Sequence, residues 1–268
     1  QVTRWQVGDR VTTPFVLACG ACASCGRGDA QVCERQLQPG FTQWGSFAEQ
    51  VALPRADVNL VAIPDDVDAD VAAGLGCRFA TAYRAVAHVA LVRAGETVVV
   101  HGCGGVGLAS VMVALARGAT VLAVDPSEVS RALAADLGAV PVTPGDDVEG
   151  ADVSLDCFGS RATLAASVAC LRPRGRHVQV GLLGGDDAQP AVDMGRVVGL
   201  ELQLLGSHGM GAAAYPEMLA LIADGTLEPH RLLRDRIGLA YVPGRLAALG
   251  EPGAGVGHFI GMMPENLR

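Results

Sequence analysis

The sequence predicts an α/β protein in which a doubly wound parallel sheet is inserted into a β-rich body. Apolar strands alternate with helices between residues 97 and 205, and a glycine-rich loop joins the first of these strands to its helix. Shorter apolar runs separated by Gly, Pro and Asp lie before this region. Buried strands that alternate with helices are typical of a parallel sheet covered on both faces.

Length and composition fit one or two folded domains. The chain has 268 residues, of which 50% are hydrophobic and 18% charged, so it is too apolar to be disordered. Its net charge is −8 and it has no basic stripe, which disfavours a nucleic-acid partner. All 20 basic residues are Arg, so Schiff-base chemistry on a lysine is excluded.

One uncharged window, residues 97–116, has the length of a membrane span. It contains four glycines and His101 and changes pattern midway, so we interpret it as strand, loop and helix. No membrane partner is therefore expected. Eight cysteines are too few for a disulfide scaffold of this length, so the expected location is a reducing cytoplasm.

The elements follow in order along the chain. Residues 1–60 are expected to form irregular β structure around the apolar runs 11–16, 47–53 and 58–63, and a helix is expected from Phe79 to Val92. We predict strands at 97–101, 120–124, 153–156, 176–180 and 201–205, and helices at 106–117, 127–137, 161–171, 193–198 and 215–223. Domain boundaries are placed after residues 77 and 207, so that 1–77 and 208–268 form the β-rich body.

Four cysteines lie close together in the first of these segments, at Cys19, Cys22, Cys25 and Cys33. Four thiolates can close a tetrahedral zinc site with about 2.3 Å to each sulfur, and such a site is structural because it has no open position. Two disulfides, an iron–sulfur cluster and free thiols are the alternatives. Glu34 stands where bacterial cluster motifs usually have Pro.

The glycine-rich loop has the spacing Gly-x-Gly-x-x-Gly between a buried strand and an apolar helix. In this context the glycines permit a tight turn, a close approach of pyrophosphate and close packing of helix on strand. We therefore predict a dinucleotide site at Gly102, Gly104, Gly105 and Gly107. Glycines that only punctuate the chain are the alternative.

The next strand ends in Asp125, 18 positions after Gly107. A carboxylate there can accept hydrogen bonds from both ribose hydroxyls of the adenosine and repels a 2′-phosphate. Residues 126–128 offer no compensating cation, so the sequence favours NAD over NADP. Arg131 is either a further contact at the adenosine end or a solvated helix residue.

In combination these residues resemble the zinc-containing medium-chain alcohol dehydrogenases. The matching stretches follow the family's order along essentially the whole chain: 8–11, the four-cysteine lobe, 45–49, 76–83, and the glycine loop with Asp125. The resemblance implies a GroES-like catalytic domain, residues 1–77 and 208–268, with the structural zinc lobe at 19–33. It implies an NAD-binding Rossmann domain at 78–207.

The resemblance also implies site residues that the pattern alone does not identify. Cys77, which by itself is typical of a buried thiol, becomes a ligand of a catalytic zinc. Thr81 and Val106 would pack against the nicotinamide, and Phe158 would border the adenine. The remaining cysteines match no ligand position and are expected to be core thiols: Cys103, Cys157 and Cys170.

The chain departs from the family pattern at its start. The family supplies its other catalytic-zinc ligands, a Cys and a Gly-His-Glu segment, upstream of Gln1, and no His of this chain lies in such a segment. We therefore expect some dozens of N-terminal residues to be absent. As written, the chain is expected to bind the structural zinc but not to hold a catalytic zinc or turn over. His258 falls where some members carry a basic residue near the coenzyme phosphates.

For the intact parent protein, the residues and the resemblance predict a zinc-dependent oxidoreductase that transfers a hydride between an alcohol, or its aldehyde or ketone, and NAD. The alternatives are a polyol or sugar dehydrogenase of the same family, a noncatalytic NAD-binding protein with a structural zinc, and a zinc-ribbon nucleic-acid module. The expected partners are a small-molecule substrate and other copies of the chain, in a homodimer or homotetramer.

Overall fold

The computed structural model describes residues 2–249 and 258–262, and the chain divides into two compact units. Unit 1 combines Gln1–Ala80 with Gly209–Arg268, and unit 2 is Thr81–His208. The chain therefore leaves unit 1, forms unit 2 and returns to unit 1. The boundaries predicted at 77 and 207 lie within a few residues of these limits and, as domain boundaries, stay predictions.

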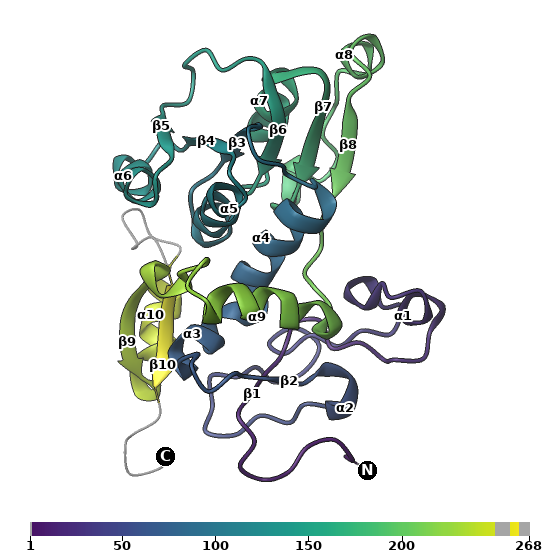
Figure 1. Ribbon diagram of the computed structural model, residues 1–268, viewed down its shortest axis with the longest axis vertical. Helices are drawn as coiled ribbons and strands as arrows, with labels where there is room; N and C mark the ends of the chain where they lie inside the picture. The colour runs from purple at the N-terminus through teal and green to yellow at the C-terminus, as the bar shows by residue number, and fades with distance from the viewer. Residues whose placement is uncertain (1, 250–257, 263–268) are drawn as a thin grey trace. The chain divides into compact units, whose positions relative to one another are not determined.

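Unit 2 is built on one parallel sheet of six strands (Figure 1). They are β3 (Thr97–His101), β4 (Thr120–Val124), β5 (Val140–Val142), β6 (Ala151–Asp156), β7 (Leu171–Gln179) and β8 (Gln203–Gly206). Their order in the sheet is β5-β4-β3-β6-β7-β8, so the direction of winding reverses between β3 and β6. Open α/β sheets bind ligands at the carboxyl ends of their strands beside such a reversal.

Burial and capping explain the elements of unit 2. Its helices are α5 (Gly105–Ala116), α6 (Glu128–Leu137), α7 (Arg161–Ala169) and α8 (Met194–Gly199). Residues 98–100 of β3 have no exposed surface, as expected for a central strand covered on both faces. Helix α6 begins where the Ser127 side chain accepts a hydrogen bond from the Ser130 N–H, and it ends at Gly138 in the left-handed conformation, φ 111°.

Unit 1 contains little regular strand. β1 (Val11–Thr12) pairs antiparallel with β2 (Val61–Ala62), and β9 (Leu233–Gly238) pairs parallel with β10 (His258–Met262). The α-helices of unit 1 are short: α1 (Ala23–Gly26), α2 (Ala56–Asn59), α3 (Ala69–Gly74), α9 (Tyr215–Ala223) and α10 (Val242–Ala248). Helix α9 has the predicted bounds.

The β structure expected for the first sixty residues is largely wrong. Only residues 11–12 of the run 11–16 and 61–62 of the run 58–63 form strands, the run 47–53 forms none, and residues 56–59 are helical. An apolar run becomes a strand only when another strand accepts and donates its backbone hydrogen bonds. No described strand pairs with 47–53.

The predictions for unit 2 are closer. β3 and β4 have the predicted bounds, and the window 97–116 is strand, loop and helix, as expected. The three-residue strand β5 was not predicted. Where the sequence passes from unit 1 to unit 2, α4 (Ala80–Arg84) is flanked by two π-helical turns, η2 (Leu75–Phe79) and η3 (Ala85–Val89), although one regular helix was expected. Among the described residues, no helix combines the length and apolar character needed to cross a membrane.

Candidate functional site

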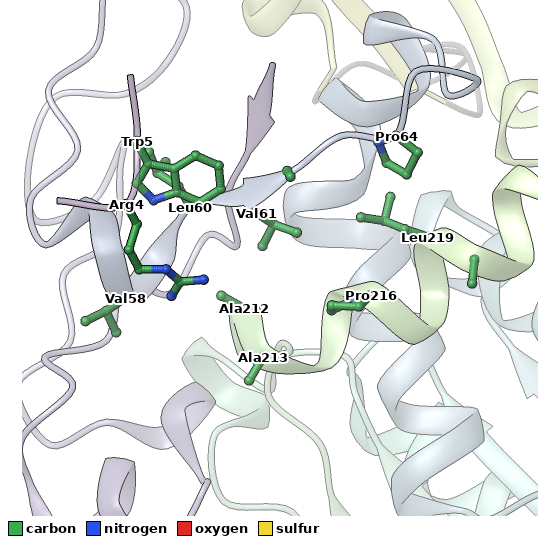
Figure 2. A pocket seen from close by; sticks show the side chains of 12 residues that line it. Arg4, Trp5, Val58, Leu60, Val61, Pro64, Ala212, Ala213, Pro216 and Leu219 are labelled. Carbon is green, nitrogen blue, oxygen red and sulfur yellow. The ribbon is translucent and has the colours of Figure 1, made fainter. Parts of the chain in front are cut away.

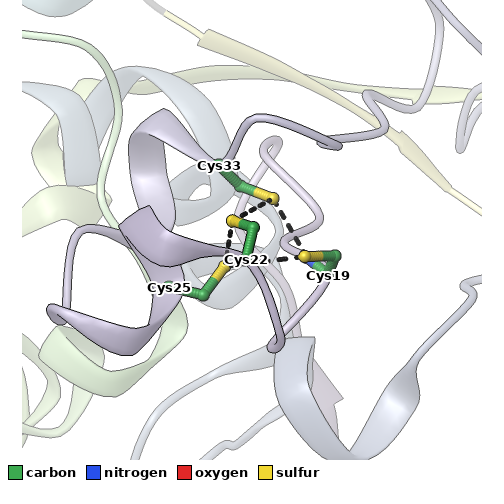
Figure 3. A group of neighbouring side chains, drawn as sticks. All are labelled: Cys19, Cys22, Cys25 and Cys33. Carbon is green, nitrogen blue, oxygen red and sulfur yellow. Dashed lines mark hydrogen bonds between the residues drawn. The ribbon is translucent and has the colours of Figure 1, made fainter.

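The four predicted metal ligands of unit 1 lie together (Figure 3). All four Sγ atoms are within 4.8 Å of one another; Cys22 and Cys25 are 3.4 Å apart, Cys22 and Cys33 3.7 Å, and Cys19 and Cys25 3.9 Å. Four sulfurs about 2.3 Å from a tetrahedral zinc stand about 3.8 Å apart. The spacing therefore fits one zinc ion, and none of the four cysteines is in a disulfide.

Backbone N–H groups point at these sulfurs. The Sγ of Cys33 accepts hydrogen bonds from the N–H of Cys19 at 3.2 Å and of Arg35 at 3.3 Å. The N–H of Ala21 lowers the pKa of Cys19 to about 6, whereas burial raises the pKa of Cys33 to about 11. The thiols therefore do not ionise together by themselves, and a bound cation is what would favour four thiolates at once.

The lobe is attached to the rest of unit 1 by a buried side chain that the sequence did not single out. Asn59 is 1% exposed; its Oδ1 accepts from the N–H of Ala18 at 2.7 Å, and its Nδ2 donates to the Ala18 carbonyl at 3.1 Å. Because the two residues are 41 positions apart, no local pattern pointed to this contact. Asn59 thus fixes the chain directly before Cys19.

The glycine loop of unit 2 joins β3 to α5, as predicted, and two of its glycines are required by packing. Gly102 has φ 88°, and a Cβ there would lie 2.8 Å from the Cβ of Phe158. A Cβ at Gly107 would lie 1.8 Å from the carbonyl oxygen of Gly102. Only glycine lets the first turn of α5 pack this closely against the loop.

Gly104 differs from these two glycines. It is the exposed N-cap of α5, its φ is −78°, and no atom lies within 4 Å of the place its Cβ would take. The fold therefore does not require glycine here. A helix N-terminus without a side chain in the way is where a ligand phosphate can approach the backbone N–H groups. As coenzyme contacts, Gly104 and its neighbour Gly105 stay predictions.

Asp125 lies beside this loop at the end of β4. Its Oδ2 accepts a hydrogen bond from the N–H of Cys103 at 2.7 Å, and its Oδ1 accepts one from the N–H of Ser127 at 2.8 Å. These bonds fix the carboxylate between the glycine loop and the start of α6. Each oxygen can accept a further hydrogen bond, so the position fits the predicted ribose contact.

The other predicted coenzyme residues are partly or largely accessible and differ in their contacts. Arg131 is not a freely solvated side chain, since its Nη1 donates to the carbonyl oxygens of Asp125 at 2.6 Å and Pro126 at 3.0 Å. Phe158 is 67% exposed, although its backbone packs against Gly102. Val106, in the first turn of α5, and Thr81, in α4, are half-buried. Their contacts with a coenzyme stay predictions.

Cys77 lies in the π-helical turn η2 of unit 1 and is exposed. The carbonyl oxygen of the preceding Gly76 accepts hydrogen bonds from the Phe15 N–H at 2.8 Å and the buried Tyr215 hydroxyl at 3.3 Å. A Cβ at Gly76 would lie 2.7 Å from the carbonyl oxygen of Thr13. The contacts with Phe15, Tyr215 and Thr13 therefore fix the position of this turn. Turns of this π-helical kind are frequent at functional sites.

Among the described residues, only the four-cysteine lobe forms a group of three or more metal-ligating side chains. Cys77 belongs to no such group. A catalytic zinc needs three protein ligands and an open position, so one thiol does not by itself fit that ion, and we derive no step through it.

Cys103 and Cys170 are buried and Cys157 half-buried, and burial raises the pKa of all three thiols.

Unit 1 also contains an apolar pocket of about 490 Å³ between segments 58–64 and 212–220 (Figure 2). The indole Nε1 of Trp5 at its wall is buried and has no hydrogen-bond partner among the described residues. Arg4 is the only charged residue of the lining, and its Nη1 donates to the carbonyl oxygen of Asp57. The lining thus offers no acid, base or metal ligand.

The two units with these sites define a class: a zinc-type medium-chain dehydrogenase, with a metal lobe in one unit and a dinucleotide-type sheet in the other. Residues 105–224 match the family model of zinc-binding dehydrogenases, and residues 1–65 match that of the alcohol dehydrogenase GroES-like domain. An alcohol dehydrogenase of Geobacillus stearothermophilus is 31% identical over 265 residues, which cover 91% of this chain and 77% of the relative. The chain belongs to the zinc-containing alcohol dehydrogenase family.

Other relatives of similar sequence identity are named for different substrates. A sorbitol dehydrogenase of Halalkalibacterium halodurans is 31% identical over 241 residues, covering 83% of this chain and 68% of the relative. An L-threonine 3-dehydrogenase of Mesorhizobium japonicum is 32% identical over 255 residues, covering 89% and 71%. Family membership therefore leaves the substrate open.

Solved structures show the same fold. The alcohol dehydrogenase TADH from Thermus sp. ATN1 superposes with a TM-score of 0.85 at 29% identity, covering 92% of this chain and 76% of that one. A thermostable alcohol dehydrogenase from Pyrobaculum aerophilum, bound to cobalt and zinc, gives 0.84 at 29% identity, covering 96% and 76%. A zinc-binding dehydrogenase from Sinorhizobium meliloti 1021 bound to NADP gives 0.83 at 28%, covering 95% and 76%. The predicted α/β fold with a GroES-like part is confirmed.

Proposed function

We propose that the protein is an NAD-dependent, zinc-type oxidoreductase that transfers a hydride between an alcohol and its aldehyde or ketone. The observation that carries the coenzyme part is the Asp125 carboxylate, held beside the glycine loop by the N–H groups of Cys103 and Ser127. A carboxylate fixed at this point can accept hydrogen bonds from ribose hydroxyls. The alcohol part is supported by the alcohol dehydrogenases among the relatives.

The charges around Asp125 favour NAD over NADP. A 2′-phosphate would approach the Asp125 carboxylate and Glu128, which lies in the first turn of α6. Arg131 is the nearby cation, but it donates to two carbonyl oxygens of the same turn. Because a related structure is bound to NADP, the preference rests on these residues and not on family membership.

The metal proposal distinguishes two kinds of site. Cys19, Cys22, Cys25 and Cys33 would hold a structural zinc, which cross-links the lobe and has no position open to substrate. Cys77 stays the proposed protein ligand of a catalytic zinc. Such an ion, when bound with its full ligand set, supplies Lewis-acid polarisation of the alcohol oxygen.

Oxidation of a polyol is the second candidate. The sorbitol dehydrogenase of H. halodurans has the same 31% identity as the alcohol dehydrogenase of G. stearothermophilus. The two candidates share the coenzyme site and differ in the residues that line the substrate pocket.

Calorimetric titration of the full chain with NAD⁺ and NADP⁺ tests the coenzyme, and NADH formation with primary alcohols, secondary alcohols and sorbitol tests the substrate. We expect NAD⁺ to bind at least about tenfold more tightly than NADP⁺, which corresponds to about 1.4 kcal/mol. No heat with either coenzyme would overturn the proposal. Because Cys77 lies in no group of metal-ligating side chains among the described residues, the chain is expected to bind NAD⁺ without forming NADH. NADH formation together with a zinc content of about two per chain would overturn that expectation.

We also propose that copies of the chain associate as a homodimer or homotetramer. Strand β8 is at the edge of the sheet, its Leu204 is 39% exposed, and Val198 of α8 is 74% exposed. A second copy can cover an open strand edge with apolar side chains. Light scattering after gel filtration should show a single oligomer that Leu204→Arg weakens; a monomeric wild type contradicts the proposal. None of the eight cysteines is in a disulfide, which suits the predicted cytoplasmic location.

A further inference from the structure

A chain of buried polar side chains in unit 2 runs along β6, α7 and β7 toward the carboxyl edge of the sheet. Ser154, Asp156 and Ser167 have no exposed surface, and His177 is 2% exposed. The Oγ of Ser167 lies 2.6 Å from the Oγ of Ser154 and 2.7 Å from the Nδ1 of His177. The Nε2 of His177 lies 3.3 Å from the Oε1 of Gln179, whose Nε2 donates to Asp156.

The direction of these hydrogen bonds follows from Gln179. Its Nε2 has two acceptors, the Oδ2 of Asp156 at 3.0 Å and the carbonyl oxygen of Gly181 at 2.9 Å, so its Oε1 is the atom that faces His177. An amide oxygen only accepts, so the Nε2 of His177 carries the proton and its Nδ1 accepts from Ser167. Burial lowers the pKa of His177, and the ring is therefore neutral near pH 7.

Asp156 is the last residue of this hydrogen-bonded series, and its carboxylate accepts hydrogen bonds from four donors. Its Oδ1 accepts from the N–H of Phe158 at 3.0 Å and of Gly159 at 2.9 Å. Its Oδ2 accepts from the Oγ1 of Thr163 and the Nε2 of Gln179, both at 3.0 Å. Hydrogen bonds to a buried carboxylate are stronger than those between neutral groups. Asp156 therefore fixes the turn after β6 and ties it to β7.

The turn that Asp156 fixes is packed against its neighbours more closely than a side chain permits. A Cβ at Gly159 would lie 2.5 Å from the carbonyl oxygen of Leu182, and one at Gly181 would lie 2.4 Å from the Gly159 nitrogen. On the other side, a Cβ at Gly102 would lie 3.0 Å from the nitrogen of Phe158. The loops after β3, β6 and β7 thus form one continuous row, which includes the reversal of strand order.

We propose that Asp156, supported by Gln179, is a positioning residue for the coenzyme: it holds the loops after β6 and β7 against the glycine loop before the dinucleotide binds. The proposal rests on the proposed function, since it presupposes that NAD binds at this edge. A site that is already ordered binds more tightly, because no loop has to be ordered during binding. Without the Asp156 carboxylate, the coenzyme itself would have to order the row.

The test compares Asp156→Asn with a matched control, Asp152→Asn. Asp152 is on the same strand at its other end, where it accepts from the Thr97 N–H at 2.8 Å and the Arg172 Nε at 2.6 Å. Calorimetry on the full chain should show that Asp156→Asn raises the Kd for NAD⁺ about tenfold, whereas Asp152→Asn leaves it unchanged. Both variants are expected to lower the melting temperature, so stability alone does not separate them.

Hydrogen–deuterium exchange shows where order is lost, and so separates a local effect on the coenzyme-binding loops from a general loss of stability. In Asp156→Asn without coenzyme, peptides containing residues 157–160 and 180–183 should exchange faster than in wild type, and saturating NAD⁺ should restore their protection. In Asp152→Asn these peptides should exchange as in wild type. If Asp156→Asn does not fold, Gln179→Leu removes one of the four donors and should raise the Kd about threefold.

The outcomes separate the two proposals. Equal Kd values for wild type and Asp156→Asn, or for wild type and a folded Gln179→Leu when Asp156→Asn does not fold, overturn the positioning role and leave NAD binding in place. Equal weakening by the Asp156 and Asp152 variants also overturns it, because the effect would then be one of general stability. A wild-type chain that binds no NAD⁺ overturns the proposed function, and this proposal with it.

Discussion

The metal lobe of unit 1 and the sheet of unit 2 hold their functional residues in different ways. In the lobe, residues 19–33 contain only the four-residue helix α1 and one 3₁₀ turn, and their thiols face one another. In the sheet, the glycine loop is anchored on β3, whose residues 98–100 have no exposed surface. A short segment with little regular structure gains much of its order from a bound ion, whereas burial in a covered sheet orders a loop without any ligand.

The lobe and the glycine loop should also respond differently to changes in the molecule. Removing the ion should disorder the lobe and leave the loop in place, and overcrowding the sheet should do the reverse.

Cys22→Ser should remove the lobe's zinc completely, because three thiolates do not close a four-ligand site. Metal analysis should find one zinc equivalent fewer per chain than in wild type, and the melting temperature should fall. Coenzyme affinity should not change, since the glycine loop belongs to unit 2. Cys157→Ser, which removes a thiol outside the lobe, is the control, and this variant should have the wild-type zinc content. A Cys22→Ser chain with wild-type metal content and stability would show that the quartet is not a metal site.

Gly107→Ala should destabilise unit 2 by about 3 kcal/mol, at the upper end of the usual cost of overpacking, because its Cβ would lie 1.8 Å from the Gly102 carbonyl oxygen. Gly104→Ala is the matched control, since nothing lies within 4 Å of its Cβ position. Denaturant unfolding should show that Gly104→Ala loses at most about 1 kcal/mol, the cost of alanine at an N-cap, while calorimetry shows weaker NAD⁺ binding. If Gly104→Ala binds NAD⁺ as wild type does, the phosphate does not approach this residue.

Acid should destabilise unit 2 through His101, which is 5% exposed and whose pKa burial lowers from 6.5 to about 4. Between these values the unfolded chain binds more protons than the folded one. Stability is therefore complete above about pH 6.5 and declines toward pH 4, by on the order of 3 kcal/mol.

Urea unfolding at several pH values checks this expectation. His101→Gln should give a less steep decline, and the remainder should come from His177 and His208, because burial lowers the pKa of these two side chains as well. The exposed His88→Gln should keep the wild-type slope. Equal slopes for wild type and His101→Gln would assign the acid sensitivity to other groups.

Asp125→Ser should have the smallest effect on the fold and a specific effect on the coenzyme. The variant loses the carboxylate that accepts from Cys103 and Ser127, and with it the charge that repels a 2′-phosphate. NAD⁺ should bind about tenfold more weakly, or about 1.4 kcal/mol, and the ratio of NADP⁺ to NAD⁺ affinity should rise. An unchanged ratio in parallel titrations would remove Asp125 from the ribose site.

Sequence patterns predicted unit 2 better than unit 1. Central parallel strands are apolar on both faces, so β3 and β4 stand out as uninterrupted runs with the observed bounds. The run 47–53 is interrupted by Glu49 and Gln50, and no described strand is its partner. Whether such a run is a strand depends on that partner, which composition does not report.

The site shows the same division. The cysteine spacing and the glycine spacing are local, and the structure brings together the residues that they indicate. Asn59, which holds the lobe, and Gln179, which reaches back 23 positions to Asp156, belong to no motif. Arg131 had two interpretations, and only the structure showed that it holds the turn after Asp125.

Local patterns were enough to predict the class of fold, the four-thiol lobe, the glycine loop and the acidic residue after the next strand, because periodicity and the spacing of a few residues encode them. The packed structure was needed to show which glycines the packing requires, which donors bind the Asp156 carboxylate, and which apolar runs become strands. These features depend on contacts between segments that lie far apart along the chain, and such contacts leave no local pattern.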